Sequence, residues 1–287
     1  MRIAVYSRSS PDYLVDIVTD GLVRMLGRSN LHLAYSIPPV RDLTTRQLFI
    51  GFEGPNEFPI EEADILVASV RGTMELAESW IKKTRGRFVV LDGDDDDQIK
   101  EPYREIAHVY FKREYLADRK YRMNVCPLPF GAIPEALPPE IKPRRGVYFR
   151  GLHHRHPMRA EVAKILTHRG FKVSQSGIPK EDYNAALAAS LVGVSVPGAG
   201  YDTYRYWETA YFGCALLSQR LPILIPDNFR DGEEAVFWGS TADFEAALVS
   251  LLEHPEKAAA IGDAARTACL ERHLSVHRAQ TVLTAAL

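Results

Sequence analysis

The stretch GYDTYRYWETAYFGCALLS, residues 200–218, decides the fold because it joins a helical pattern, a glycine and an apolar run. If the stretch is helical as far as Gly213, the rings of Tyr204, Trp207 and Tyr211 share one face at spacing i, i+3 and i+7. Gly213 is then placed to end the helix, and CALLS follows as a buried strand. This order is typical of a βα repeat in a parallel sheet.

The same helix carries charges on the arc beside its aromatic face. These are Asp202, Arg205 and Glu208. One interpretation is a salt-bridge ladder on a solvated helix, where each i, i+3 pair contributes a few tenths of a kcal/mol. The other is that the charges face a ligand. The residues of this stretch alone leave both interpretations open.

Short apolar runs alternate with helical patterns through residues 1–115. The apolar runs are RIAVYS, LHLAYS, ADILVASV, RFVVLDG and AHVYFKREY, and the helical patterns are YLVDIVTDGLVRMLG and TMELAESWIKK. This alternation predicts βα units with parallel strands. Ser10 and Thr73 are expected to be helix N-caps, and Gly27 and Gly86 are expected to end helices.

A proline-rich segment divides the chain into two units. Residues 127–146 contain six prolines and show neither helical nor strand periodicity. A second βα series follows, with strands predicted at GVYFRGL, FKVSQSG, LVGVSVPG and CALLSQ. We expect an α/β protein with Rossmann-like domains over residues 1–130 and 147–287, joined by a linker over 131–146 and facing each other across a cleft.

From Thr241 onward the sequence is helical, with breaks expected near Pro255 and His273. This predicts a helical carboxyl-terminal tail. Because ligands of open α/β sheets bind beyond the carboxyl ends of the strands, the cleft between the two domains is the expected site.

Composition narrows the class of protein. The formal net charge is −2, the sequence pI is about 6.5 and 46% of residues are hydrophobic, which fits a globular protein and argues against nucleic acid as a partner. Cys126, Cys214 and Cys269 form no CxxC pair, which argues against a zinc site and a disulfide framework. With no signal-peptide pattern and no long apolar run, we expect a cytoplasmic protein with at most peripheral membrane association.

The stretch also fits a family pattern, G-x-D-T-x-R-x-W-E-x-x-x-x-G. The matching residues are Gly200, Asp202, Thr203, Arg205, Trp207, Glu208 and Gly213. Together with FRDGEEAVFW and the segment that continues to His273, the pattern resembles the carboxyl-terminal domain of GT-B glycosyltransferases, especially the group-one-like, spore-maturation-type set. In the first domain only VVLDGDDD and YFKREY resemble that family. The resemblance implies transfer of a sugar from a nucleotide-diphosphate sugar to an acceptor hydroxyl, with no further cofactor.

The resemblance assigns the nucleotide to the helix of the opening stretch. Glu208 is implied to hold the ribose hydroxyls, and a carboxylate can accept one hydrogen bond at each oxygen from such a diol. Asp202, Thr203 and Arg205 are assigned to the nucleotide beside it. Many retaining relatives carry a second glutamate at the position of Gly200. Because this chain does not, inversion is slightly preferred over retention.

A leaving diphosphate needs positive charge or helix amides, and FRGLHHRHPMRAEV supplies both. The residues assigned to it are Arg150, Gly151, His153, His154 and Arg155, with Arg155 as first choice and Arg159 and Arg205 in support. Pro157 suits the first turn of the next helix. The alternatives are a solvated loop and, less favoured, a metal site formed by the histidines.

The acidic run LDGDDDDQI follows the predicted strand RFVV and points at the same cleft. Asp92 or Asp94 is the candidate general base for the acceptor hydroxyl, provided that its surroundings raise its pKa. The alternative is a run that caps the next helix. The run also contains D-x-D, but we expect no metal, with protein cations in its place. YFKREY, residues 110–115, either borders the cleft or forms a surface charge cluster.

Two other functions fit the same residues. A sugar-nucleotide 2-epimerase shares this architecture and would turn over its donor without an acceptor. A noncatalytic sugar-nucleotide-binding protein would bind nucleotide without transfer. The sequence does not identify the base, the sugar or the acceptor, which is a glycan, a lipid, a protein or a small molecule.

Overall fold

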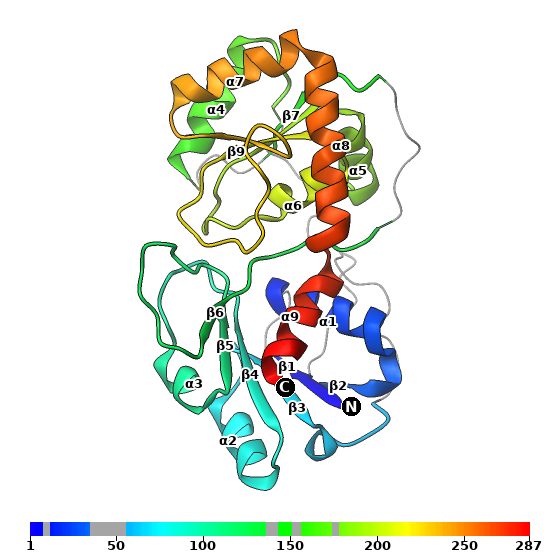
Figure 1. The fold of residues 1–287 in the computed structure, drawn as a ribbon, viewed down its shortest axis with the longest axis vertical. Coiled ribbons are helices and arrows are strands. Elements are labelled where there is room, and N and C mark those ends of the chain that lie inside the picture. Colours follow the sequence, from blue (N-terminus) through cyan, green and yellow to red (C-terminus); the bar gives the residue numbers. More distant parts are fainter. Residues whose placement is uncertain (8–11, 35–55, 136–142, 151–155, 174–177) are drawn as a thin grey trace.

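The structure is a computed structural model. It describes residues 1–7, 12–34, 56–135, 143–150, 156–173 and 178–287. Figure 1 shows two units along the long axis of the molecule, with both chain ends in the lower one. Within the described ranges, no helix has the length and apolar character needed to cross a membrane.

In the part of the chain that the structure describes, the first unit has six parallel strands in the order β2-β1-β3-β4-β5-β6. The strands are β1 (Ile3–Tyr6), β2 (Leu31–Ala34), β3 (Ile65–Ser69), β4 (Arg87–Asp92), β5 (Val109–Lys112) and β6 (Val125–Pro127). The helices are α1 (Tyr13–Leu26), α2 (Met74–Lys83) and α3 (Glu101–Ile106), with short 3-10 turns η1 (Arg28–Asn30) and η2 (Ile60–Glu62).

Alternation along the strands explains why this sheet is covered on both faces. Ile3 and Val5 belong to the core that includes α1, whereas Ala4 and Tyr6 belong to the core that includes residues of α2 and α3. All four are buried. A strand with both faces buried reads as a continuous apolar run, which is the pattern of RIAVYS.

The described part of the second unit has four parallel strands in the order β10-β9-β8-β7. They are β7 (Val147–Tyr148), β8 (Val192–Ser195), β9 (Ala215–Gln219) and β10 (Val236–Trp238). The helices are α4 (Pro157–His168), α5 (Lys180–Ala189), α6 (Tyr204–Tyr211), α7 (Thr241–Glu253) and α8 (Pro255–Arg272).

Helix α6 packs unusually close to this sheet. A Cβ atom at Gly193 of β8 would lie 2.4 Å from Cγ2 of Thr209, so a glycine is required for the contact. The helix is therefore fixed against the strand that precedes it, and its side chains are positioned by the sheet.

The last helix, α9 (Ser275–Ala286), returns to the first unit and packs along α1 (Figure 1). The Ser275 hydroxyl donates to the carboxylate of Asp20, and Val282 is buried in the core shared with α1. The sequence analysis assigned all of 147–287 to the second domain. That assignment does not hold for α9, because its apolar face completes the cover of α1. The other domain boundaries stay predictions.

The predicted helix N-caps and helix ends agree with the structure in part. Thr73 is the N-cap of α2, and Gly27, with φ 80°, follows α1 as its C-cap, as the sequence predicts. The N-cap of α1 is Asp12, so the prediction for Ser10, which lies outside the described residues, was wrong. Helix α2 ends before Gly86 is reached.

The predicted breaks of the carboxyl-terminal helices near Pro255 and His273 are confirmed. Of the strand predicted at FKVSQSG, residues 171–173 are not a strand, and residues 174–177 lie outside the described ranges. Strand β6 was not predicted, because its few residues lie beside the proline-rich segment.

Candidate functional site

The carboxyl ends of the two sheets meet at the boundary between the units. The Glu114 carboxylate, just after β5, accepts a hydrogen bond from the backbone N–H of Tyr201, which lies between β8 and α6. Leu116 forms an antiparallel bridge with Ile223, beyond β9. The loops that follow the strands of both units therefore face each other, as expected for a ligand site between two α/β domains.

Glu208 of α6 is held by two residues of α5. Its carboxylate accepts hydrogen bonds from the hydroxyl of Tyr183 and from Lys180 Nζ, the latter at 3.1 Å. Lys180 Nζ also lies 3.0 Å from the carboxylate of Glu135. The Glu208 side chain is only 9% exposed. A lysine and a phenol on the same carboxylate fix its orientation.

The alternative of a solvated ladder on this helix is wrong. Asp202, Arg205 and Glu208 are 2%, 6% and 7% exposed. The aromatic residues Tyr204 and Trp207 are buried as predicted. Because every residue of α6 is buried, its charges do not face bulk water.

Asp202 fastens the start of α6 to the segment that leaves β6. Its Oδ1 accepts from Trp207 Nε1 at 2.8 Å, and its Oδ2 accepts from the backbone N–H of Phe130 at 2.5 Å. Burial raises the pKa of Asp202. Both oxygens are thus bonded inside the protein, and its predicted contact with nucleotide stays a prediction. Thr203 is the N-cap of α6, and its hydroxyl lies 3.4 Å from that of Ser195.

The structure describes only the two ends of the predicted phosphate-binding loop. Gly151, His153, His154 and Arg155 lie outside the described residues. The Arg150 guanidinium lies 5.8 Å from the ring centroid of Tyr183, and so it is beside the residue that holds Glu208. The sequence analysis assigned Arg150 and Glu208 to the same ligand, although they lie far apart in the sequence. In the structure both lie beside Tyr183.

Helix α4 begins at Pro157 as predicted, and the His156 ring, as its N-cap, accepts a hydrogen bond from the Met158 N–H at 3.3 Å. Arg159, a supporting candidate for phosphate, is buried and donates to the carbonyl of Pro197 at 2.7 Å. It thus joins α4 to the segment that follows β8, and its assignment to phosphate stays a prediction.

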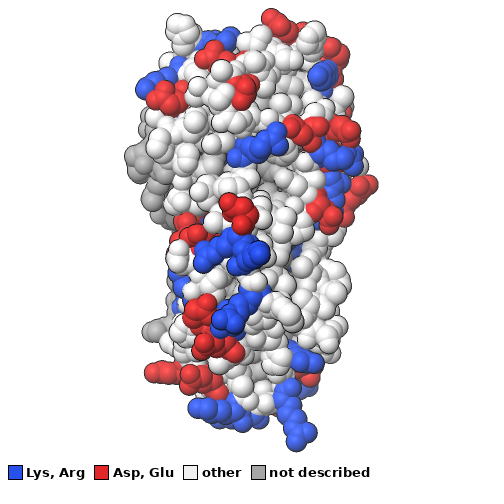
Figure 2. Space-filling view, turned by 60° about the vertical axis from the view of Figure 1, so that its left-hand side comes forward, with Lys and Arg blue, Asp and Glu red and all other residues white. Residues whose placement is uncertain are grey.

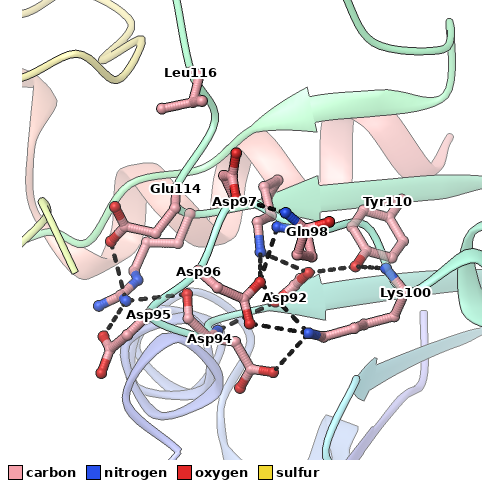
Figure 3. Close-up of polar contacts among 12 residues, drawn as sticks. Asp92, Asp94, Asp95, Asp96, Asp97, Gln98, Lys100, Tyr110, Glu114 and Leu116 are labelled. Carbon is pink, nitrogen blue, oxygen red and sulfur yellow. Dashed lines mark hydrogen bonds and ion pairs between the residues drawn. The ribbon is translucent and has the colours of Figure 1, made fainter. Parts of the chain in front are cut away.

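Asp92 ends β4 inside a closed polar cluster (Figure 3). Lys112 Nζ donates to Asp92 Oδ2 at 2.9 Å, and the Tyr110 hydroxyl donates to the same oxygen. The side chains of Asp92 and Lys112 are 0% exposed. Burial raises the pKa of Asp92, and the Lys112 ammonium opposes that shift. Asp92, one of the two candidate bases, is therefore enclosed, and its role as base stays a prediction.

Asp94 is more open and lies between two cations. Arg71 Nε is 2.9 Å from its Oδ1, Lys100 Nζ is 3.6 Å from its Oδ2, and the Asp94 side chain is 25% exposed. Its role as general base stays a prediction. The alternative of a helix-capping run is wrong, since Lys100 is the N-cap of α3 and the aspartates of the run pair with cations (Figure 3).

Two further acids lie at the start of α1, where Asp12 is the N-cap and Asp16 is in the first turn. Asp12 reaches Ser69 at the end of β3, beside β1, where the strand order of the first sheet reverses. Asp12 accepts hydrogen bonds from Ser7 at 2.9 Å and from Ser69. Asp16 is buried without a hydrogen-bond partner for either oxygen, and burial raises its pKa to about 9. The sequence analysis missed this pair. Its only signal was an aspartate shortly after the first strand, in a polar segment.

The acidic run carries no metal-binding arrangement in the described ranges. There, no group of three or more His, Cys, Asp or Glu side chains could hold a metal ion. On the face drawn in Figure 2, acidic and basic residues are interspersed, and neither sign covers that face. This distribution agrees with the small net charge of −2.

Comparisons with known proteins agree with this geometry. Residues 157–284 match a family model described as "Glycosyl transferase-like". That match contains α4 through α8 and most of α9, including Glu208. No curated protein matches the chain at a significant level.

Solved structures resemble the whole chain. HepE of Anabaena in complex with UDP is similar over 99% of this chain and 99% of its own, at 12% identity and a TM-score of 0.60. Sucrose-phosphate synthase of Thermosynechococcus elongatus is similar over 99% and 98%, at 10% identity and 0.60. A glycosyltransferase of Rickettsia africae is similar over 99% and 97%, at 11% identity and 0.62. The fold is therefore the two-domain GT-B fold predicted from the sequence.

Proposed function

We propose that this protein is a glycosyltransferase that moves a sugar from a nucleotide-diphosphate sugar to an acceptor hydroxyl. The observation that carries the proposal is the fixed carboxylate of Glu208. It lies on α6 in the segment that matches a glycosyl transferase-like family model, and Tyr183 and Lys180 hold it in place. A pre-oriented carboxylate is suited to accept two hydrogen bonds from the vicinal hydroxyls of a ribose.

We assign phosphate binding to the segment that joins β7 to α4. Arg150 at its start and the N-terminus of α4 at its end are both described, and Arg155 lies between them in the sequence. A cation and free helix amides stabilise the charge that develops on a leaving diphosphate without a metal ion. Metal independence is part of the proposal on that ground.

The reaction is a displacement at the anomeric carbon. The acceptor oxygen forms the new bond to that carbon, the bond from the carbon to the diphosphate oxygen breaks, and the acceptor proton passes to a general base. Asp94 is the candidate base, because it is part-exposed and Asp92 is enclosed. Inversion is slightly preferred, since Gly200 offers no second carboxylate for retention. Excluding water from the boundary between the domains limits hydrolysis of the donor.

UDP is the first nucleotide to test, because the similar structures of HepE contain UDP or UDP-glucose. The test is a thermal-shift series with UDP, GDP, ADP, CDP and dTDP. A ligand at 100 times its Kd stabilises the folded state by about 2.7 kcal/mol. Stabilisation by one of them, followed by transfer from its sugar derivative only when an acceptor is added, supports the proposal. No stabilisation by any of the five would contradict it.

A further inference from the structure

Glu114 is a buried carboxylate from the first unit that is bonded to the second. It follows β5 and is 1% exposed. Its Oε2 accepts from the backbone N–H of Tyr201 at 2.9 Å, and its Oε1 accepts from the backbone N–H of Asp202 at 3.2 Å. These two amides belong to the turn that leads directly into α6. One side chain therefore holds two successive backbone groups across the domain boundary.

Arg113 completes this contact. Its Nη2 lies 3.0 Å from Glu114 Oε1, and its Nη1 donates to the carbonyl of Asp202 at 3.3 Å. The guanidinium also lies 4.5 Å from the ring centroid of Phe130. The charge of Glu114 is thus matched by a cation that is itself only 3% exposed. Figure 3 marks the ion pair of the Glu114 carboxylate with a dashed line.

The same carboxylate fills the space beside Gly200. A Cβ atom at Gly200 would lie 2.5 Å from Glu114 Oε1, 2.8 Å from Arg113 Nη2 and 3.0 Å from Asp95 Oδ1. The backbone of Gly200 is not in the positive-φ region, so its conformation is open to any residue. Only the lack of space excludes a side chain at this position. Moving the Glu114 carboxylate away would break its hydrogen bonds to two backbone amides.

We propose that Glu114 is a positioning residue that orients the start of α6 from the first domain, and that it occupies the space which a side chain at position 200 would need. The proposal deepens the proposed function, on which it rests, because α6 carries Glu208. The carboxylate fixes the backbone of Tyr201 and Asp202, Asp202 fixes Trp207, and Glu208 is the next residue along the helix. Loss of Glu114 releases the amino-terminal end of α6.

A matched pair of substitutions tests the contact without any ligand. Gly200→Ala is expected to lower the melting temperature by at least about 4 °C, because its methyl group meets a fixed carboxylate. In a Glu114→Ala background the same change should cost less than half as much. Gly239→Ala is the control, since its Cβ would meet nothing closer than 3.7 Å. An equal cost of Gly200→Ala in both backgrounds would overturn the proposal.

UDP affinity separates positioning from general stability. Glu114→Gln keeps the size of the side chain but turns an amide N–H₂ toward backbone N–H donors, so it should weaken UDP binding by at least about 10-fold. The control is Asp20→Asn, a change at a buried carboxylate of α1 that accepts from Ser275 and Arg24. It should lower the melting temperature and leave the Kd for UDP within about twofold.

A pH series adds an independent measurement. Burial raises the pKa of Glu114 from 4.5 to about 7, with Asp202 adding to the shift and Arg113 opposing it. Asp95, paired with Arg113, also faces this cluster. The folded state then binds more protons than the unfolded state between pH 4.5 and pH 7, so the stability contributed by Glu114 falls as pH rises through that window. Glu114→Gln should abolish this fall, and an unchanged profile would count against the assignment.

Different results would refute the proposed function and the positioning role of Glu114. If the parent does not bind UDP or any other nucleoside diphosphate, the proposed function fails, and the role of Glu114 in a donor site fails with it. If the parent binds UDP and Glu114→Gln binds it equally well, the proposed function stands and the positioning role is wrong.

Discussion

The ammonium of Lys112 lies 2.9 Å from the carboxylate of Asp92, and neither side chain is exposed. The two residues end neighbouring strands, since Asp92 is the last residue of β4 and Lys112 the last of β5, and they are paired in the sheet register. The ion pair therefore lies at the edge of the sheet that faces the second domain. Its enclosure makes it part of the structure that supports the site.

Asp92→Asn is expected to destabilise the protein. It leaves the Lys112 charge without its buried partner, and breaking such a pair typically costs about 3 to 5 kcal/mol. Chemical denaturation measures the loss of unfolding free energy. The matched control is Asp96→Asn, whose side chain is 46% exposed and should cost much less. Equal stability of Asp92→Asn and the parent would refute the structural role.

Asp94→Asn is expected to affect turnover and not nucleotide affinity. If Asp94 is the general base, its loss lowers kcat by about 10²- to 10⁴-fold. The Kd for the nucleoside diphosphate should stay near that of the parent, because the residue belongs to the first domain. Transfer assays and binding titrations of the same preparations separate the two effects. If kcat is unchanged, the base lies elsewhere.

Transfer activity is expected to persist in a chelator. The proposal assigns the diphosphate to protein cations and helix amides, so removing divalent ions should leave the rate nearly unchanged. The measurement is transfer with and without EDTA, followed by addition of Mn²⁺ or Mg²⁺. Activity that is lost in EDTA and restored by either ion would return the acidic run after β4 to consideration as a metal site.

Much of the fold could be predicted because it depends on local patterns. The strand runs RIAVYS and ADILVASV are buried on both faces, and the glycine and proline signals at Gly27 and Pro255 mark real helix boundaries. The place of α9 could not be predicted in the same way. Its helical pattern shows an apolar face but does not say which unit that face covers.

The sequence predicted individual site residues within single segments but not the contacts between segments. The sequence singled out Glu208 and the acidic run, but it gave no sign that Lys180 and Tyr183 of α5 would contact Glu208, because that contact depends on how two helices pack on one sheet. The enclosure of Asp92 could not be predicted for a related reason. Its partner Lys112 comes from another strand, and only the sheet register brings them together.

The central claim is that Glu208 binds the ribose of a nucleotide. The most direct measurement is the Kd for UDP of the parent and of Glu208→Ala by isothermal titration calorimetry, with Glu256→Ala, a change at an exposed side chain of α8, as control. Loss of charge-assisted hydrogen bonds worth about 1.5 to 3 kcal/mol predicts affinity weaker by roughly 10-fold to a few hundred-fold, with the control unchanged. A folded Glu208→Ala variant that binds UDP as tightly as the parent would contradict the account.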